Sequence, residues 1–101
     1  MKVAYVAGPY NSTTINGVCE NIQRAREVAL KYWRLGYSVI CPHMNTAFMD
    51  GENDVAMFLA GDIEILKRCD VLILMRNWEN SEGARGEYET ALDSGLTIIR
   101  E

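Results

Sequence analysis

The stretch Asp70-Val71-Leu72-Ile73-Leu74-Met75 is the most apolar run in the chain. A short, continuously apolar run of this kind is typical of a central parallel strand that is covered on both faces. Helices on both sides of a sheet provide that cover. The run therefore predicts an α/β fold, and the segments before and after it agree with this prediction.

Strand-like and helix-like segments alternate along the whole chain. Short apolar runs predict further strands at residues 2–7, 37–41 and 96–99, and apolar residues at helical spacing predict helices over about 19–35, over 55–67 and between the polar loop 77–82 and Gly95. The segment 10–18 is polar and the segment 43–54 is irregular, and both predict loops. The order β-α-β-α-β-α-β predicts a three-layer α/β/α domain whose four-stranded parallel sheet has the strand order 2-1-3-4, like a shortened flavodoxin- or Rossmann-like sheet.

Composition narrows the class of protein. The 101 residues predict one domain spanning 1–101, and 49% hydrophobic residues are enough for a core. A net charge of -4 without a basic run argues against a nucleic-acid polymer as partner. Three widely spaced cysteines and one histidine predict free thiols, no metal site and no cofactor. No apolar run approaches the ~18 residues of a membrane span, so we expect a soluble cytoplasmic protein.

The predicted sheet indicates where a ligand would bind. Ligands of open parallel sheets sit at the carboxyl ends of the strands, where the strand order reverses, which here is between the first and third strands. The loops gathered there are 8–11, 43–45 and 77–85. In the first loop, Gly8 either permits close approach by a ligand or only makes the turn. In the second, His43 either contacts a base or is a loop histidine without a special role.

The third loop and its helix, residues 80–91, are the most informative stretch. Gly83 and Gly86 lie around the predicted helix start, where free amides favour an anion, and Ser81 is a candidate N-cap. Glu87 follows in the first turns of this helix, where a glutamate is usually a solvated carboxylate that interacts favourably with the helix dipole. Composition and spacing alone therefore leave its role open.

Three motifs that occur in a fixed order along the chain give more information about its function. They are Tyr5-Val-Ala-Gly8-Pro9, then Asp62 with Asp70-Val-Leu-Ile following, then Ser81-x-Gly83-x-x-x-Glu87-x-x-x-Ala91-x-x-x-Gly95. Together they resemble the nucleoside 2-deoxyribosyltransferase-like superfamily over nearly the whole chain. That group also contains hydrolases that cut the base from nucleoside 5'-monophosphates, and short, often phage-encoded members.

The resemblance implies a role for each matching residue. Glu87 falls on the nucleophilic glutamate, Asp62 on the aspartate that assists proton transfer to the leaving base, and Tyr5 on a tyrosine that contacts the nucleophile and the sugar. The matching positions that would bind substrate are Gly8, Pro9, Gly83 and Ser81, which is a phosphate contact in the monophosphate hydrolases. Two further candidates lie outside the motifs: Arg85, close to Ser81 as a charge partner for a phosphate, and His43 after the second strand.

The function this implies is cleavage of the N-glycosidic bond of a (deoxy)nucleoside or nucleoside 5'-monophosphate. Attack by the Glu87 carboxylate would form a covalent glycosyl ester, which water or a second base would resolve, making the chain a hydrolase or a 2-deoxyribosyltransferase. Two alternatives stay open at this point: a non-catalytic nucleotide-binding or sensor module, and an accessory phage protein acting by protein contacts. Because the relatives share their sites between subunits, we also expect a homodimer or higher homo-oligomer.

Overall fold

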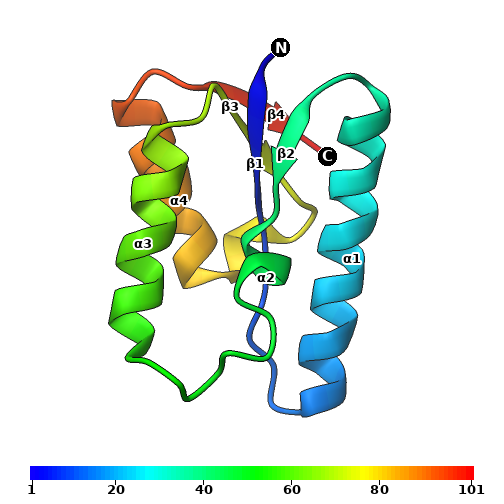
Figure 1. The fold of residues 1–101 in the computed structure, drawn as a ribbon, viewed down its shortest axis with the longest axis vertical. Helices are drawn as coiled ribbons and strands as arrows, with labels where there is room; N and C mark the ends of the chain where they lie inside the picture. Colours follow the sequence, from blue (N-terminus) through cyan, green and yellow to red (C-terminus); the bar gives the residue numbers. More distant parts are fainter.

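The computed structural model describes residues 1–101 and contains the predicted alternation of strands and helices. In chain order the elements are β1 (Val3–Ala7), α1 (Ile15–Arg34), β2 (Ser38–Ile40), α2 (Pro42–Asn45), α3 (Val55–Lys67), β3 (Val71–Leu74), the 3-10 helix η1 (Trp78–Asn80), α4 (Glu82–Asp93) and β4 (Thr97–Arg100), shown in Figure 1.

The four strands form one parallel sheet in the order β2-β1-β3-β4, which confirms the predicted topology. In the middle of the sheet, Tyr5 pairs with Ile40 of β2 on one side and with Leu72 of β3 on the other. The strand order reverses between β1 and β3, so the loops that follow these two strands begin on either side of the reversal.

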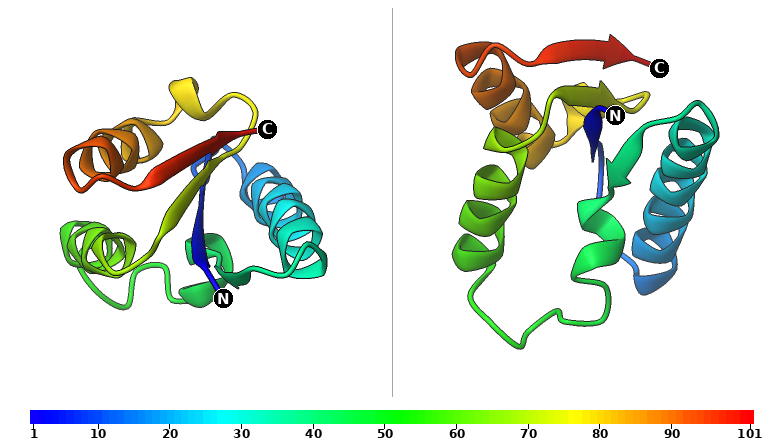
Figure 2. Two further views of the ribbon diagram at one scale, coloured as in Figure 1. Left: turned by 90° about the horizontal axis from the view of Figure 1, so that it is seen from above. Right: turned by 45° about the horizontal axis from the view of Figure 1, so that its top comes forward.

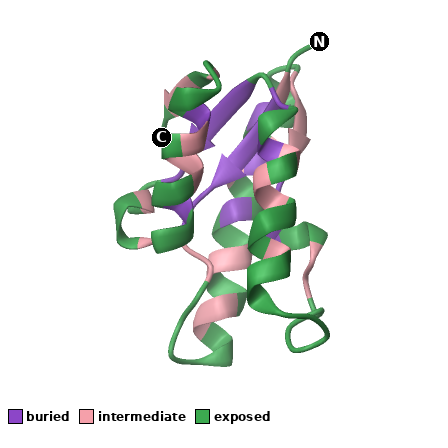
Figure 3. Cartoon of the chain, turned by 90° about the vertical axis from the view of Figure 1, so that its left-hand side faces the viewer, coloured by how far each residue is buried: buried purple, intermediate pink, exposed green.

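Helices cover both faces of this sheet, and α1 lies on the opposite side from α3 and α4 (Figure 2). The side chains of β1 alternate between the two layers. Ala4 and Val6 belong to the core cluster that includes residues of α1, whereas Tyr5 and Ala7 belong to the cluster with residues of α3 and α4. All four residues of β3 are buried, as its continuous apolar run predicts, and Figure 3 shows the buried sheet between more exposed helices.

Three local details differ from the sequence prediction. Helix α1 begins at Ile15, four residues before the expected start, because the Thr14 side chain caps it by accepting a hydrogen bond from the Gly17 amide at 2.9 Å. The supposedly irregular segment after β2 opens with the short helix α2, which has Pro42 at its first position, a favoured place for proline. The loop after β3 contains η1.

Helices α1 and α4 end just before the glycines that the sequence analysis expected to terminate them. Gly36 and Gly95 have positive φ angles of 98° and 73°, a backbone conformation that favours glycine after a helix. The longest helix, α1, has 20 residues and carries several charges. No helix combines the length and apolar character needed to cross a membrane.

Candidate functional site

The centre of the site is a contact between β1 and α4. Tyr5 lies in the middle of β1 and is fully buried, and its side chain points into the layer formed by α3 and α4. There its hydroxyl donates a hydrogen bond to Oε2 of Glu87, a residue 82 positions later in the chain. Strand pairing fixes the position of Tyr5 and helix α4 that of Glu87, so rigid elements hold both sides of the contact.

The Glu87 carboxyl group is held in an unusual electrostatic environment. Burial raises its pKa from the ordinary 4.5 to about 7, the Tyr5 hydrogen bond opposes this rise, and the charge of Asp62 adds to it. No lysine, arginine or histidine is among the groups that shift it. A carboxyl group with a pKa near neutrality can exist in both protonation states at physiological pH.

Asp62 supplies a second acid from a different helix. It lies on α3 and is partly buried, and this burial raises the pKa of its carboxyl group. Its charge acts on both Glu87 and Tyr5, which places all three groups in one electrostatic cluster. Burial, followed by the charge of Glu87, raises the pKa of the Tyr5 phenol far above its ordinary value, so this hydroxyl stays protonated and remains a hydrogen-bond donor.

The side chains expected to contact a phosphate make hydrogen bonds to the protein's own backbone. The Ser81 hydroxyl caps α4 by accepting a hydrogen bond from the Ala84 amide at 3.1 Å. The Arg85 guanidinium donates to the Glu79 carbonyl oxygen at 2.6 Å and is exposed. Gly83 is exposed at the first turn of α4, and a Cβ there would meet only ordinary contacts. Phosphate binding by Ser81 and Arg85 stays a prediction.

Packing explains Gly8. A Cβ at this position would lie 2.4 Å from the sulfur of Met75 and 2.7 Å from its Cβ. Met75 is a buried core residue at the end of β3, so it cannot give way easily. The glycine is therefore required for the close approach of two chain segments where β1 ends.

His43 is buried and is not a loop residue at the surface. It lies in α2, 5% exposed, and Nε2 is 3.0 Å from the carbonyl oxygen of Pro9. Because a carbonyl oxygen only accepts, Nε2 carries the proton and donates. Burial lowers the pKa of the imidazole, which keeps it neutral. His43 thereby fixes the Gly8–Pro9 turn, and its contact with a base stays a prediction.

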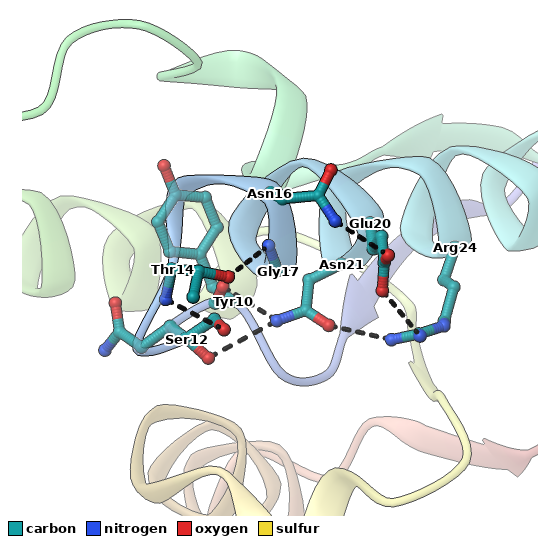
Figure 4. Close-up of polar contacts among 9 residues, drawn as sticks. Tyr10, Ser12, Thr14, Asn16, Gly17, Glu20, Asn21 and Arg24 are labelled. Atoms are coloured by element: carbon teal, nitrogen blue, oxygen red, sulfur yellow. Dashed lines mark hydrogen bonds and ion pairs between the residues drawn. The ribbon is translucent and has the colours of Figure 1, made fainter.

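Sequence reasoning missed a polar network that holds the loop after β1 (Figure 4). The side-chain amide of Asn21 donates to the carbonyl oxygens of Tyr10, at 2.9 Å, and Asn11, at 3.3 Å. The Tyr10 hydroxyl also donates to Asp50 at 2.9 Å, which ties this loop to the segment before α3. No spacing in the sequence relates Asn21 or Asp50 to Tyr10, because the contacts arise from the packing of three separate segments.

Two cavities lie away from this cluster. One of about 360 Å³ lies between α1, β2 and α2, and one of about 440 Å³ lies at the ends of β3 and β4. Neither is lined by Tyr5, Asp62 or Glu87. No three histidine, cysteine, aspartate or glutamate side chains are grouped so that they could hold a metal ion.

Residues 1–100 match the family model described as DUF4406, a domain of unknown function. The chain belongs to this family. Membership does not assign an activity, and no protein with a curated description matches the sequence.

Solved structures show what the fold is similar to. A 2-deoxyribosyltransferase from the psychrotolerant bacterium Bacillus psychrosaccharolyticus superposes with a TM-score of 0.68 at 17% identity, covering 97% of this chain and 70% of the other. A 2-deoxyribosyltransferase from Leishmania mexicana gives a TM-score of 0.68 at 20% identity, covering 99% of this chain and 63% of the other. The DUF4406 chain therefore shares its fold with these enzymes but spans only about two thirds of their length.

Proposed function

We propose that this chain cleaves the N-glycosidic bond of a nucleoside or nucleoside 5'-monophosphate, with Glu87 as the nucleophile. The observation that carries the proposal is the hydrogen bond from the buried Tyr5 hydroxyl to the Glu87 carboxylate, with Asp62 close enough to shift the pKa of Glu87. Similarity of fold to two 2-deoxyribosyltransferases supports the same class of chemistry.

The first step uses the ionised form of Glu87. A carboxylate oxygen attacks the anomeric carbon, the C–N bond breaks, and a glycosyl ester of Glu87 forms. The Tyr5 hydroxyl holds the carboxylate in one orientation by its hydrogen bond. The transition state resembles an oxocarbenium ion, and the negative charge of the Glu87 carboxylate stabilises its positive charge.

Asp62 suits the role of the acid that protonates the departing base. Burial raises its pKa, so it holds a proton to higher pH than an exposed aspartate does. Once the base has left, Asp62 is ionised and can accept a proton from the water that resolves the ester. A second base in place of water would give base exchange, and the chain would then act as a transferase.

Base release tests this proposal directly. The purified chain is incubated with a panel of nucleosides and 5'-monophosphates, with and without a second free base, and free base is followed by chromatography. We expect release that rises with pH as Glu87 ionises around pH 7 and that is lost in Glu87→Gln. The matched control is Glu89→Gln, which removes an exposed carboxylate from the same helix.

The same panel distinguishes catalysis from binding alone. Release that depends on Glu87 but not on Glu89 supports the glycosidase, and the appearance of a new nucleoside when a second base is present identifies transfer. Equal amounts of free base from the wild type and from Glu87→Gln with every compound would reject Glu87-dependent catalysis on these substrates. A ligand that still binds in that case would favour the nucleotide-binding module.

A further inference from the structure

The cavity of about 440 Å³ at the ends of β3 and β4 contains a pair of arginines. Arg76 and Arg100 both line it, together with the Trp78 side chain. Strand pairing brings the two arginines together, because Arg100 lies opposite Leu74 of β3 and Arg76 follows Leu74 by two residues. Two cationic side chains from separate segments of the chain therefore meet at one cavity, outside the proposed catalytic cluster.

Neither guanidinium group is neutralised by a carboxylate of the chain. The ion pairs of the structure include neither Arg76 nor Arg100. Of the two, only Arg100 has a hydrogen bond within the chain, donated to the Tyr88 hydroxyl at 3.1 Å. Because a phenol carries no charge, both cations remain free to bind an anion, although the net charge of the chain is -4.

Two carboxylates also line this cavity, but one of them is already bound. Glu101 pairs with Lys31 at 3.0 Å and accepts a hydrogen bond from the Tyr32 hydroxyl at 2.6 Å. Glu79 is exposed and belongs to no ion pair. The cavity thus has two unpaired cations against one unpaired carboxylate, and the balance of unpaired charge is positive.

We propose that this cavity binds a phosphate monoester, with the phosphate held by Arg76 and Arg100 and the organic group against Trp78. Guanidinium groups bind carboxylate and phosphate oxygens through paired hydrogen bonds. One guanidinium group satisfies the two oxygens of a carboxylate. A phosphate monoester has three terminal oxygens and a charge of about -1.5 to -2 at pH 7, which matches two guanidinium groups. This site goes beyond the proposed function and does not depend on it.

NMR titration of the full chain measures affinity and location together. The ligands are phenyl phosphate, inorganic phosphate and benzoate. The chain has two tryptophans, whose indole N–H signals are assigned with a Trp33→Phe variant, and Trp33 lines the other cavity. We expect phenyl phosphate to shift the Trp78 signal and not that of Trp33. It should bind about tenfold or more tightly than benzoate, and also more tightly than inorganic phosphate, which has no group to place against Trp78.

Substitutions test the two cations separately. Arg76→Gln and Arg100→Gln should each weaken the binding of phenyl phosphate by about tenfold or more. The matched control is Arg68→Gln, which removes another exposed arginine without an ion pair, at the end of α3 and before β3 begins. It should leave the affinity unchanged. Glu79→Gln, which removes the unpaired carboxylate, should strengthen binding by about two- to fivefold.

Melting curves establish that each variant is folded. Should Arg100→Gln unfold because it loses its contact with Tyr88, Arg76→Gln still decides the matter, since Arg76 has no such contact. A shift of the Trp33 signal instead of the Trp78 signal, or of neither, would overturn the site. Equal losses of affinity in Arg76→Gln and Arg68→Gln would also overturn it, because they would show only general attraction to positive charge.

Two further outcomes would contradict the proposal. Benzoate or inorganic phosphate binding as tightly as phenyl phosphate would overturn the assignment to a monoester. Unchanged affinity in Arg76→Gln would mean that the phosphate binds elsewhere, for example at Ser81, and would overturn the second site. Phenyl phosphate has no N-glycosidic bond, so these results are independent of whether the chain releases a base.

Discussion

Replacing Glu87 by glutamine should stabilise the protein, and most strongly above pH 7. Its carboxyl pKa is raised from 4.5 to about 7 in the folded chain. Between these values the folded state binds a proton that the unfolded state releases, so the stability from the neutral carboxyl is complete below pH 4.5 and lost as pH rises through 7. Above pH 7 the fold must hold a buried charge, which glutamine removes while keeping the shape of the side chain and its capacity to accept from Tyr5.

The size of the effect follows from the shift. A difference of about 2.5 pKa units corresponds to about 3 kcal/mol at 25 °C, a large part of the stability of a small domain. We therefore expect Glu87→Gln to be more stable than the wild type by about 3 kcal/mol at pH 8 and by about 1 kcal/mol at pH 5. In a domain of this size the difference at pH 8 corresponds to a rise in Tm on the order of 10–20 °C.

Urea and thermal unfolding at pH 5 and pH 8 measure this difference. The control is Glu89→Gln, whose carboxylate is exposed two residues further along α4 and should change stability little at either pH. The reasoning would be refuted by a Glu87→Gln variant that gains nothing on going from pH 5 to pH 8. Such a result would mean that the ionised Glu87 is solvated and that its environment does not oppose the charge.

Three further predictions test the packing and the site. Gly8→Ala should lower the free energy of unfolding by about 1–3 kcal/mol in urea, because a Cβ at this position has no space. Gly86→Ala should raise it by up to about 1 kcal/mol, because a Cβ there meets nothing within 4 Å and alanine favours the helix. Equal effects of the two substitutions would contradict the packing argument. Ser81→Ala should cost about 1 kcal/mol through the lost cap, and Ser81→Thr should recover most of it in the same assay. Tyr5→Phe should shift the pH profile of base release upward, because the Tyr5 hydrogen bond lowers the pKa of Glu87; an unchanged profile would show that this bond does not act on the nucleophile.

The sequence alone determined the fold class and the order of the strands. Apolar runs such as Val71–Leu74 and helices at regular spacing are local patterns, and the right-handed crossover between parallel strands leaves few topologies to choose from. The local errors have local causes. The start of α1 was missed because the capping Thr14 lies in a polar segment that composition describes as a loop, and α2 was missed because four residues are too few to show a helical period.

The sequence determined less of the candidate site than of the fold. The family resemblance singled out Tyr5, Asp62 and Glu87. No sequence pattern reports that a tyrosine and a glutamate 82 residues apart share a hydrogen bond, or that burial shifts the pKa of the carboxyl group. The functions of Gly8 as a packing residue and of Arg85 as a partner of a backbone carbonyl were equally invisible. Periodicity and turn chemistry act between near neighbours and can be read along the chain, whereas desolvation and long-range contacts exist only once distant segments have packed together.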